Sequence, residues 1–180
     1  MSPMENTPPR QLSSPRERTP SPPPGDHAAV YVTVYEYKDI IWPGLTRQFM
    51  RHSGLMVQAD AAIDSFNVHH IIGTPGVGMT YEFKEGLGNP RHDTGSLLSM
   101  DLVAWMPRSR VRDVKALVDQ VEIIISREWN CQNWVRAALR QFVAAGLITA
   151  QQSEAAVAKQ QRAINAPYTT NTPNSAVLEA

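Results

Sequence analysis

Five short segments rich in β-branched and aromatic residues follow one another between residues 30 and 105. They are Val30–Tyr35, His52–Val57, Asn67–Ile72, Met79–Phe83 and Ser99–Trp105. This composition is typical of strands. Most of the connections between them are too short for the crossover that parallel neighbours need. The sequence therefore predicts a small antiparallel sheet.

Three later segments have the apolar spacing of helices. The first opens at Ser109 and repeats apolar residues at helical intervals as far as Val121. The second, from Trp129 to Leu147 with Gly146 as its stop signal, has the clearest apolar stripe. An Ala- and Gln-rich helix follows over residues 150–164. Together these segments predict an α+β fold, with about five antiparallel strands packed against two or three helices.

The two ends of the chain differ in composition from the part between them. Eight of the 14 prolines lie between Pro3 and Pro24 with almost no apolar side chain, so this segment cannot offset its ordering entropy. We expect a disordered Pro-rich tail over residues 1–27, a globular domain over 28–165 and a flexible tail over 166–180. Ser-Pro and Thr-Pro steps and a run of prolines make a protein partner for the first tail an alternative to a plain solvated leader.

Charge and cysteine content argue against several function classes. The 17 basic and 17 acidic residues cancel, and the pI is near 7.0, so a nucleic-acid partner is not expected. No apolar segment approaches the roughly 20 residues that span a bilayer. No secretory signal is apparent, and the single cysteine has no disulfide partner within the chain. We therefore expect a cytoplasmic protein without a membrane span.

Cofactor and metal motifs are also not expected. The glycine-rich stretch 73–78 resembles a phosphate-binding loop, but it precedes a predicted strand, whereas a phosphate loop precedes a helix. The acidic residues Glu82, Glu85 and Asp93 show no metal-ligand spacing with a histidine, and a lone cysteine excludes the familiar zinc frameworks.

Cys131 is the residue with the clearest chemical potential, because it lies near the start of the second predicted helix. Unpaired N–H groups and the positive end of the helix dipole stabilise a thiolate there and can bind an oxyanion. The simpler interpretation is an inert, small apolar residue of the helix. A nucleophilic cysteine also needs a base, and the strand histidines His52, His69 and His70 are available. Because side chains alternate along a strand, His52 can share a face with one of the other two.

Three stretches resemble, in their order, the motifs of the circularly permuted papain-like NlpC superfamily. They are His52-Ser53-Gly54-Leu55-Met56-Val57, His70-Ile71-Ile72-Gly73 and Asn130-Cys131-Gln132-Asn133-Trp134-Val135. The resemblance covers roughly residues 30–150. It is strongest to the lecithin:retinol acyltransferase-like and PPPDE-like branches and, most closely, to fungal proteins of about this length.

The resemblance implies a permuted papain-like fold with Cys131 as nucleophile, His52 as general base and His70 as the third polar residue. His69 takes that third place if the register shifts by one. Asn130 and Gln132 flank the nucleophile as binding residues, and Trp129 is a candidate wall of the substrate cleft.

The implied function is a cysteine-dependent acyl hydrolase or acyltransferase acting on an amide, isopeptide or thioester of a small-molecule or peptide substrate. One alternative is a catalytically inactive relative that serves as an interaction module. Another is an accessory protein of a fungal biosynthetic pathway, which rests on the fungal resemblance alone.

Overall fold

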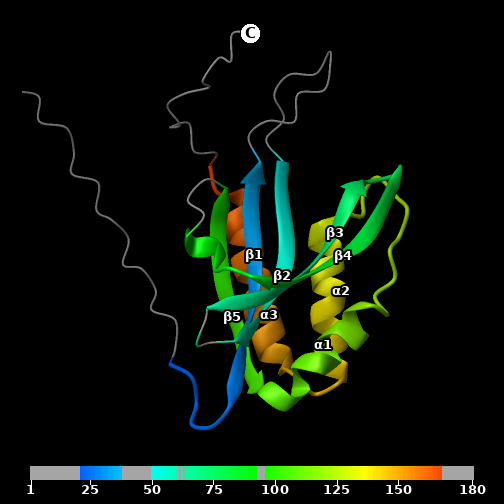
Figure 1. Ribbon diagram of the computed structural model, residues 1–180. Coiled ribbons are helices and arrows are strands. Elements are labelled where there is room, and N and C mark those ends of the chain that lie inside the picture. The colour runs from blue at the N-terminus through cyan, green and yellow to red at the C-terminus, as the bar shows by residue number, and fades with distance from the viewer. Residues whose placement is uncertain (1–20, 38–49, 61, 63, 93–95, 168–180) are drawn as a thin grey trace, which may run out of the picture.

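A five-stranded antiparallel sheet forms the centre of the protein, with strand order β4-β3-β2-β1-β5 and three helices against one face (Figure 1). The computed structural model describes residues 21–37, 50–60, 62, 64–92 and 96–167. The strands are β1 (His27–Tyr37), β2 (Met50–Asp60), β3 (Ser65–Thr74), β4 (Gly78–Leu87) and β5 (Leu97–Pro107). The helices are α1 (Val111–Val118), α2 (Cys131–Ala144) and α3 (Ala150–Asn165), with short 3-10 helices at Pro90–His92 and Arg108–Arg110. The predicted α+β arrangement is therefore confirmed.

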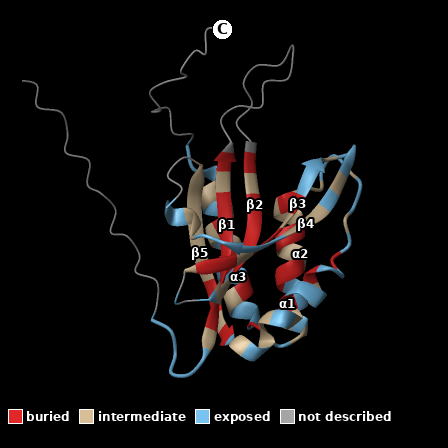
Figure 2. Cartoon of the chain, in the orientation of Figure 1, coloured by how far each residue is buried: buried red, intermediate tan, exposed pale blue. Residues whose placement is uncertain are grey.

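The main core lies between the sheet and the helices. Trp134 and Phe142 of α2 are fully buried against apolar side chains of the sheet, among them Val32, Leu55 and Ile71. Burial of side chains this large stabilises the fold by about 1.5–3 kcal/mol each. A smaller cluster around Tyr31 covers part of the opposite face. Figure 2 shows that burial is concentrated in β1, β2 and the inner side of α2.

The sheet divides at one end. The pairing of β2 with β3 stops at Leu55 and His69, whereas β2 remains paired with β1 as far as Met50, and β3 with β4 as far as Thr74. Beyond Leu55 and His69 the two halves lean apart, and α2 is visible behind the space between them (Figure 1). We call this division the fork. Its arms are residues 51–54 of β2 and 70–73 of β3.

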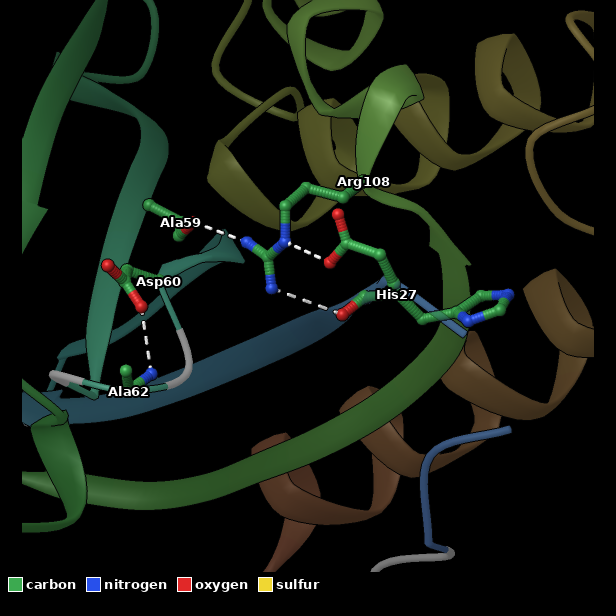
Figure 3. A network of polar contacts seen from close by, with 6 residues as sticks. His27, Ala59, Asp60, Ala62 and Arg108 are labelled. Atoms are coloured by element: carbon green, nitrogen blue, oxygen red, sulfur yellow. Dashed lines mark hydrogen bonds and ion pairs between the residues drawn. The ribbon is translucent and has the colours of Figure 1, made fainter. Parts of the chain in front are cut away.

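The opposite end of the sheet is tied together by Arg108, which follows β5. Its guanidinium donates hydrogen bonds to Asp26 Oδ1 at 2.6 Å and to the backbone carbonyls of Ala59 at 2.5 Å and His27 at 3.3 Å (Figure 3). One side chain therefore joins the start of β1, the end of β2 and the end of β5.

Two expectations about the rest of the chain concern its ends and the membrane. Residues 1–20 and 168–180, which make up most of the predicted tails, lie outside the described residues. Within the described ranges, no helix is long and apolar enough to cross a bilayer.

Candidate active site

The first turn of α2 is fixed by a capping box. Asn130 Oδ1 accepts hydrogen bonds from the N–H groups of Gln132 at 2.9 Å and Asn133 at 3.4 Å, and Asn133 Oδ1 accepts from the N–H of Asn130 at 3.1 Å. The helix therefore begins at Cys131, two residues later than the apolar pattern suggested. The side chain of Asn130, predicted to bind substrate, is the N-cap of this helix.

Cys131 lies under β2 with 7% of its surface exposed. Its Sγ accepts a hydrogen bond from the backbone N–H of Ser53 at 3.4 Å. Burial raises the pKa of the Cys131 thiol above its usual value, and the N–H groups of Ser53, Gln132 and Cys131 lower it by less. The expectation of a thiol acidified by the helix start is wrong for this state, because the sheet covers that helix end and excludes water.

His52 and His70 meet across the fork. His52 Nε2 lies 2.9 Å from His70 Nδ1, and the two rings are nearly perpendicular, with centroids 5.1 Å apart. Gly54 makes this approach close, since a Cβ at that position would lie 3.3 Å from His70 Cβ. At Gly54 the backbone of β2 therefore lies directly against the strand that carries His70. Any side chain at position 54 would be crowded against His70.

Glu82 continues the chain of hydrogen bonds on the other side of His70. The β3–β4 register places Glu82 directly opposite His70, and its Oε2 lies 2.6 Å from His70 Nε2 and 3.0 Å from Lys84 Nζ. The hydrogen bond from Lys84 lowers the pKa of Glu82, which is therefore a carboxylate at neutral pH. The sequence reasoning missed this residue. A hairpin turn assumed at residues 75–77 would have paired Glu82 with His70.

The direction of each hydrogen bond follows from the carboxylate at the end of the chain. A carboxylate only accepts, so His70 Nε2 carries the proton. A neutral His70 then has an unprotonated Nδ1, and His52 Nε2 must donate to it. His52 is consequently left with its lone pair on Nδ1. Glu82 thus sets the tautomers of both histidines so that Nδ1 of His52 is a proton acceptor.

Both histidines are neutral at pH 7. Burial, together with the nearby His70, lowers the pKa of His52 to about 4. Burial also lowers the pKa of His70, against the opposing effect of Glu82. The Cys131 thiol and the His52 imidazole at the fork are therefore both neutral. They do not form a thiolate–imidazolium pair before substrate binds.

His69 points to the helix side of the sheet. Its Nδ1 lies 2.7 Å from the hydroxyl of Tyr81, its ring packs beside Phe83, and it is 2% exposed. Burial lowers its pKa to about 4. Of the two adjacent histidines, His70 is therefore the one that contacts His52.

A cavity of about 350 Å³, which we call the fork cavity, brings most of the predicted site together. Its wall consists of Arg51, His52, His70, Ile71, Ile72, Gly73, Pro75, Met79, Asn130, Cys131 and Gln132. Trp129 is absent from this wall and packs, partly buried, against the main core. Within the described part of the chain, no group of three His, Cys, Asp or Glu side chains is placed to hold a metal ion.

The model of a family of unknown function (DUF6540) matches residues 17–149, a range that includes every residue of the fork cavity and Glu82. No curated protein and no solved structure matches the chain.

Proposed function

The chain belongs to the DUF6540 family, whose function is unknown, and from its site we propose that it is a cysteine-dependent acyl hydrolase or acyltransferase. The observation that carries the proposal is the hydrogen-bonded series Glu82–His70–His52, which ends at a cavity that also holds Cys131. A nucleophile, a base and the groups that orient the base are the components that acyl transfer through a thioester needs.

The first half of the reaction forms an acyl-thioenzyme. His52 Nδ1 takes the proton of the Cys131 thiol as Sγ attacks the carbonyl carbon of an amide, isopeptide or thioester. The carbonyl oxygen becomes an oxyanion, which the N–H of Cys131 and the positive dipole at the start of α2 stabilise, because the N–H groups of Gln132 and Asn133 already donate to Asn130. The intermediate then collapses, the bond to the leaving group breaks, and the proton on His52 Nδ1 passes to that group.

The second half returns the enzyme to its starting state. Water, or another molecule that accepts the acyl group, attacks the thioester carbon through its oxygen or nitrogen atom. His52 Nδ1 takes the proton from that attacking atom. The carbon–sulfur bond breaks, and the proton returns to Sγ. Throughout both halves Glu82 and His70 touch no reacting atom. They are positioning residues, because they hold His52 in the tautomer with a basic Nδ1.

Two features of the fold support the permuted papain-like part of the proposal. The chain order is His52, His70, Cys131, and the nucleophile lies at the start of a helix that packs beneath the strand of the base. The wall of the fork cavity combines apolar Ile72 and Met79 with the polar Gln132. Such a lining suits an acyl group or side chain of modest size on a small-molecule or peptide substrate.

A specific observation favours the alternative of an inactive relative that works as an interaction module. Cys131 is buried, and its thiol pKa is raised, so the nucleophile is protonated before substrate arrives. Catalysis then depends entirely on His52 as a base. An accessory role in a fungal pathway is compatible with either function.

The pH dependence of activity tests the role of His52. Because its pKa is lowered to about 4, His52 is neutral above that pH and protonated below it. We expect kcat/KM for hydrolysis of the acetyl thioester of N-acetylcysteamine to be level from neutral pH down to about pH 5. It should then fall about tenfold per pH unit below the pKa of the base. Product release is followed by chromatography in overlapping buffers. An acid limb near pH 6.5, the ordinary histidine pKa, would contradict a buried, neutral base at the fork.

The Glu82→Gln variant tests the positioning series. An amide can donate as well as accept, so it no longer forces the proton onto His70 Nε2, and part of the population loses the basic Nδ1 of His52. We expect kcat to fall by about 10- to 100-fold with little change in KM, the range for residues that orient a reactive group. Imidazole nitrogen resonances should show a mixed tautomer for His52. The matched control is Glu85→Gln, an exposed carboxylate on the same strand. Equal effects of the two substitutions would rule out the positioning role.

A further inference from the structure

A larger cavity lies on the sheet face that the helices leave uncovered. Its volume is about 630 Å³, and it extends over β1, β2 and β3 to the segment after β4. Its wall is mainly apolar and includes Tyr35, Met56, Val68, Leu87 and Pro90. We call it the open-face cavity. Cavities of this volume and lining are the usual size for small organic ligands.

The open-face cavity meets the fork cavity at the histidine pair. His52 and His70 line both cavities, whereas Cys131 lines the fork cavity alone. A molecule in the open-face cavity would therefore contact the two imidazoles from the side away from the nucleophile. Binding there does not require a reactive cysteine.

The charge of the wall indicates the polar end of such a molecule. Among the lining residues that the structure describes, Lys84 is the single permanently charged side chain, and half of that side chain is exposed. One of its contacts goes to Glu82 at 3.0 Å, and an ammonium has three N–H donors. The neutral polar groups nearby, Thr33, Asn89 and Ser96, add donors and acceptors without adding negative charge.

We propose that the open-face cavity binds a small apolar carboxylate, such as a medium-chain fatty acid. The apolar wall holds the chain, and Lys84 pairs with the carboxylate. This ligand lies beside the Glu82–His70–His52 series, in contact with both histidines. Its binding therefore changes the surroundings of both imidazole rings. The inference goes beyond the proposed acyl chemistry, because the site exists whether or not Cys131 reacts.

Titration of the full-length Cys131→Ser variant with octanoate, followed by calorimetry and by histidine nitrogen resonances, tests the proposal. We expect saturable binding that shifts the resonances of His52 and His70 and leaves those of His69, on the other face, unchanged. Octylammonium, with the same chain and the opposite charge, should bind at least about tenfold more weakly, which corresponds to about 1.4 kcal/mol. Because the nucleophile is absent from this variant, the outcome is independent of the proposed enzymatic function.

Two substitutions locate the ligand. Leu87→Trp, at a half-exposed wall residue, fills the cavity and should abolish octanoate binding. Val77→Trp adds the same bulk at an exposed position outside both walls and should leave binding unchanged. Lys84→Met should weaken octanoate and remove the preference over octylammonium. Absence of saturable binding, equal affinity for the two chains, or binding that survives Leu87→Trp would each overturn the proposal.

Discussion

The Cys131→Ser variant is expected to lose more than about 10³-fold of kcat for thioester hydrolysis, because a hydroxyl cannot replace the thiol in a covalent route. The substitution keeps the fold, since a serine Oγ can still accept the hydrogen bond that the Ser53 N–H donates to Sγ. Thioester hydrolysis under saturating substrate, together with the thermal unfolding midpoint, measures both effects.

The matched control for the fork is His69→Gln. This substitution keeps a hydrogen-bonding group near the Tyr81 hydroxyl on the helix side and does not touch the fork cavity. We expect its kcat to stay within about tenfold of wild type, even where it lowers the unfolding midpoint through lost packing. If the Cys131→Ser protein hydrolyses thioesters as fast as the His69→Gln protein, Cys131 is not the nucleophile. That result would favour the alternative of an interaction module.

The Arg51→Met variant is expected to lose about 3–5 kcal/mol in the free energy of unfolding, the cost of removing one partner from a buried ion pair. Arg51 donates to Glu36 Oε2 at 3.0 Å, with the two side chains 3% and 1% exposed. It also donates to the carbonyls of Ala163 at 2.6 Å and Ile164 at 2.5 Å, at the end of α3. The substitution thus removes the counter-charge of a buried carboxylate and the cap of a helix in one step. Urea unfolding monitored by tryptophan fluorescence measures the change.

Two further variants identify the cause of that loss. Glu36→Gln combined with Arg51→Met also removes the buried charge that Arg51 pairs with, and we expect it to be more stable than Arg51→Met alone. Arg112→Met removes an equally long cation whose side chain is 88% exposed, and it should change stability by less than about 0.5 kcal/mol. If Arg51→Met and Arg112→Met cost the same, the buried pair does not hold α3 to the sheet.

The predicted strands and helices could be derived because their signals are local. The β-branched and aromatic composition of residues 30–35, the apolar run at 67–72 and the apolar stripe of α2 each fall inside one element, and each element formed where it was expected. The ends were less accurate. The apolar stripe could not show that the Asn130 side chain caps the helix, because the residue just before the cap, Trp129, is itself apolar.

The fork could not be predicted from the sequence. It exists because the β2–β3 pairing stops at Leu55 and His69, while the β1–β2 and β3–β4 pairings continue. No residue pattern within β2 or β3 alone indicates where their pairing stops. The link from His70 to Glu82 depends on the hairpin register. The partner of Arg51 at the end of α3 depends on a contact more than 100 residues away in sequence.

The thiol pKa illustrates the same difficulty in chemical terms. A helix start lowers a cysteine pKa when water and the helix dipole both reach the sulfur. The sequence placed Cys131 at that helix start, but it could not show that β2 lies over it and buries the sulfur. Desolvation of the sulfur depends on the packing of segments that are distant in sequence. A local sequence pattern therefore cannot predict it.

The most direct test of the account is the transfer of an acyl group to Cys131 itself. Wild-type protein and the His52→Ala variant are mixed with p-nitrophenyl acetate at pH about 6, where an ordinary thiol with a pKa near 8.5 is protonated. The samples are then quenched in acid and analysed as intact protein and as peptides by mass spectrometry. We predict one acetyl group on Cys131 of the wild type, released by hydroxylamine, and acylation slower by about 10²- to 10⁴-fold without the base. Acetylation elsewhere in the chain, or acylation of Cys131 at the same rate in the two proteins, would contradict a nucleophile activated by His52.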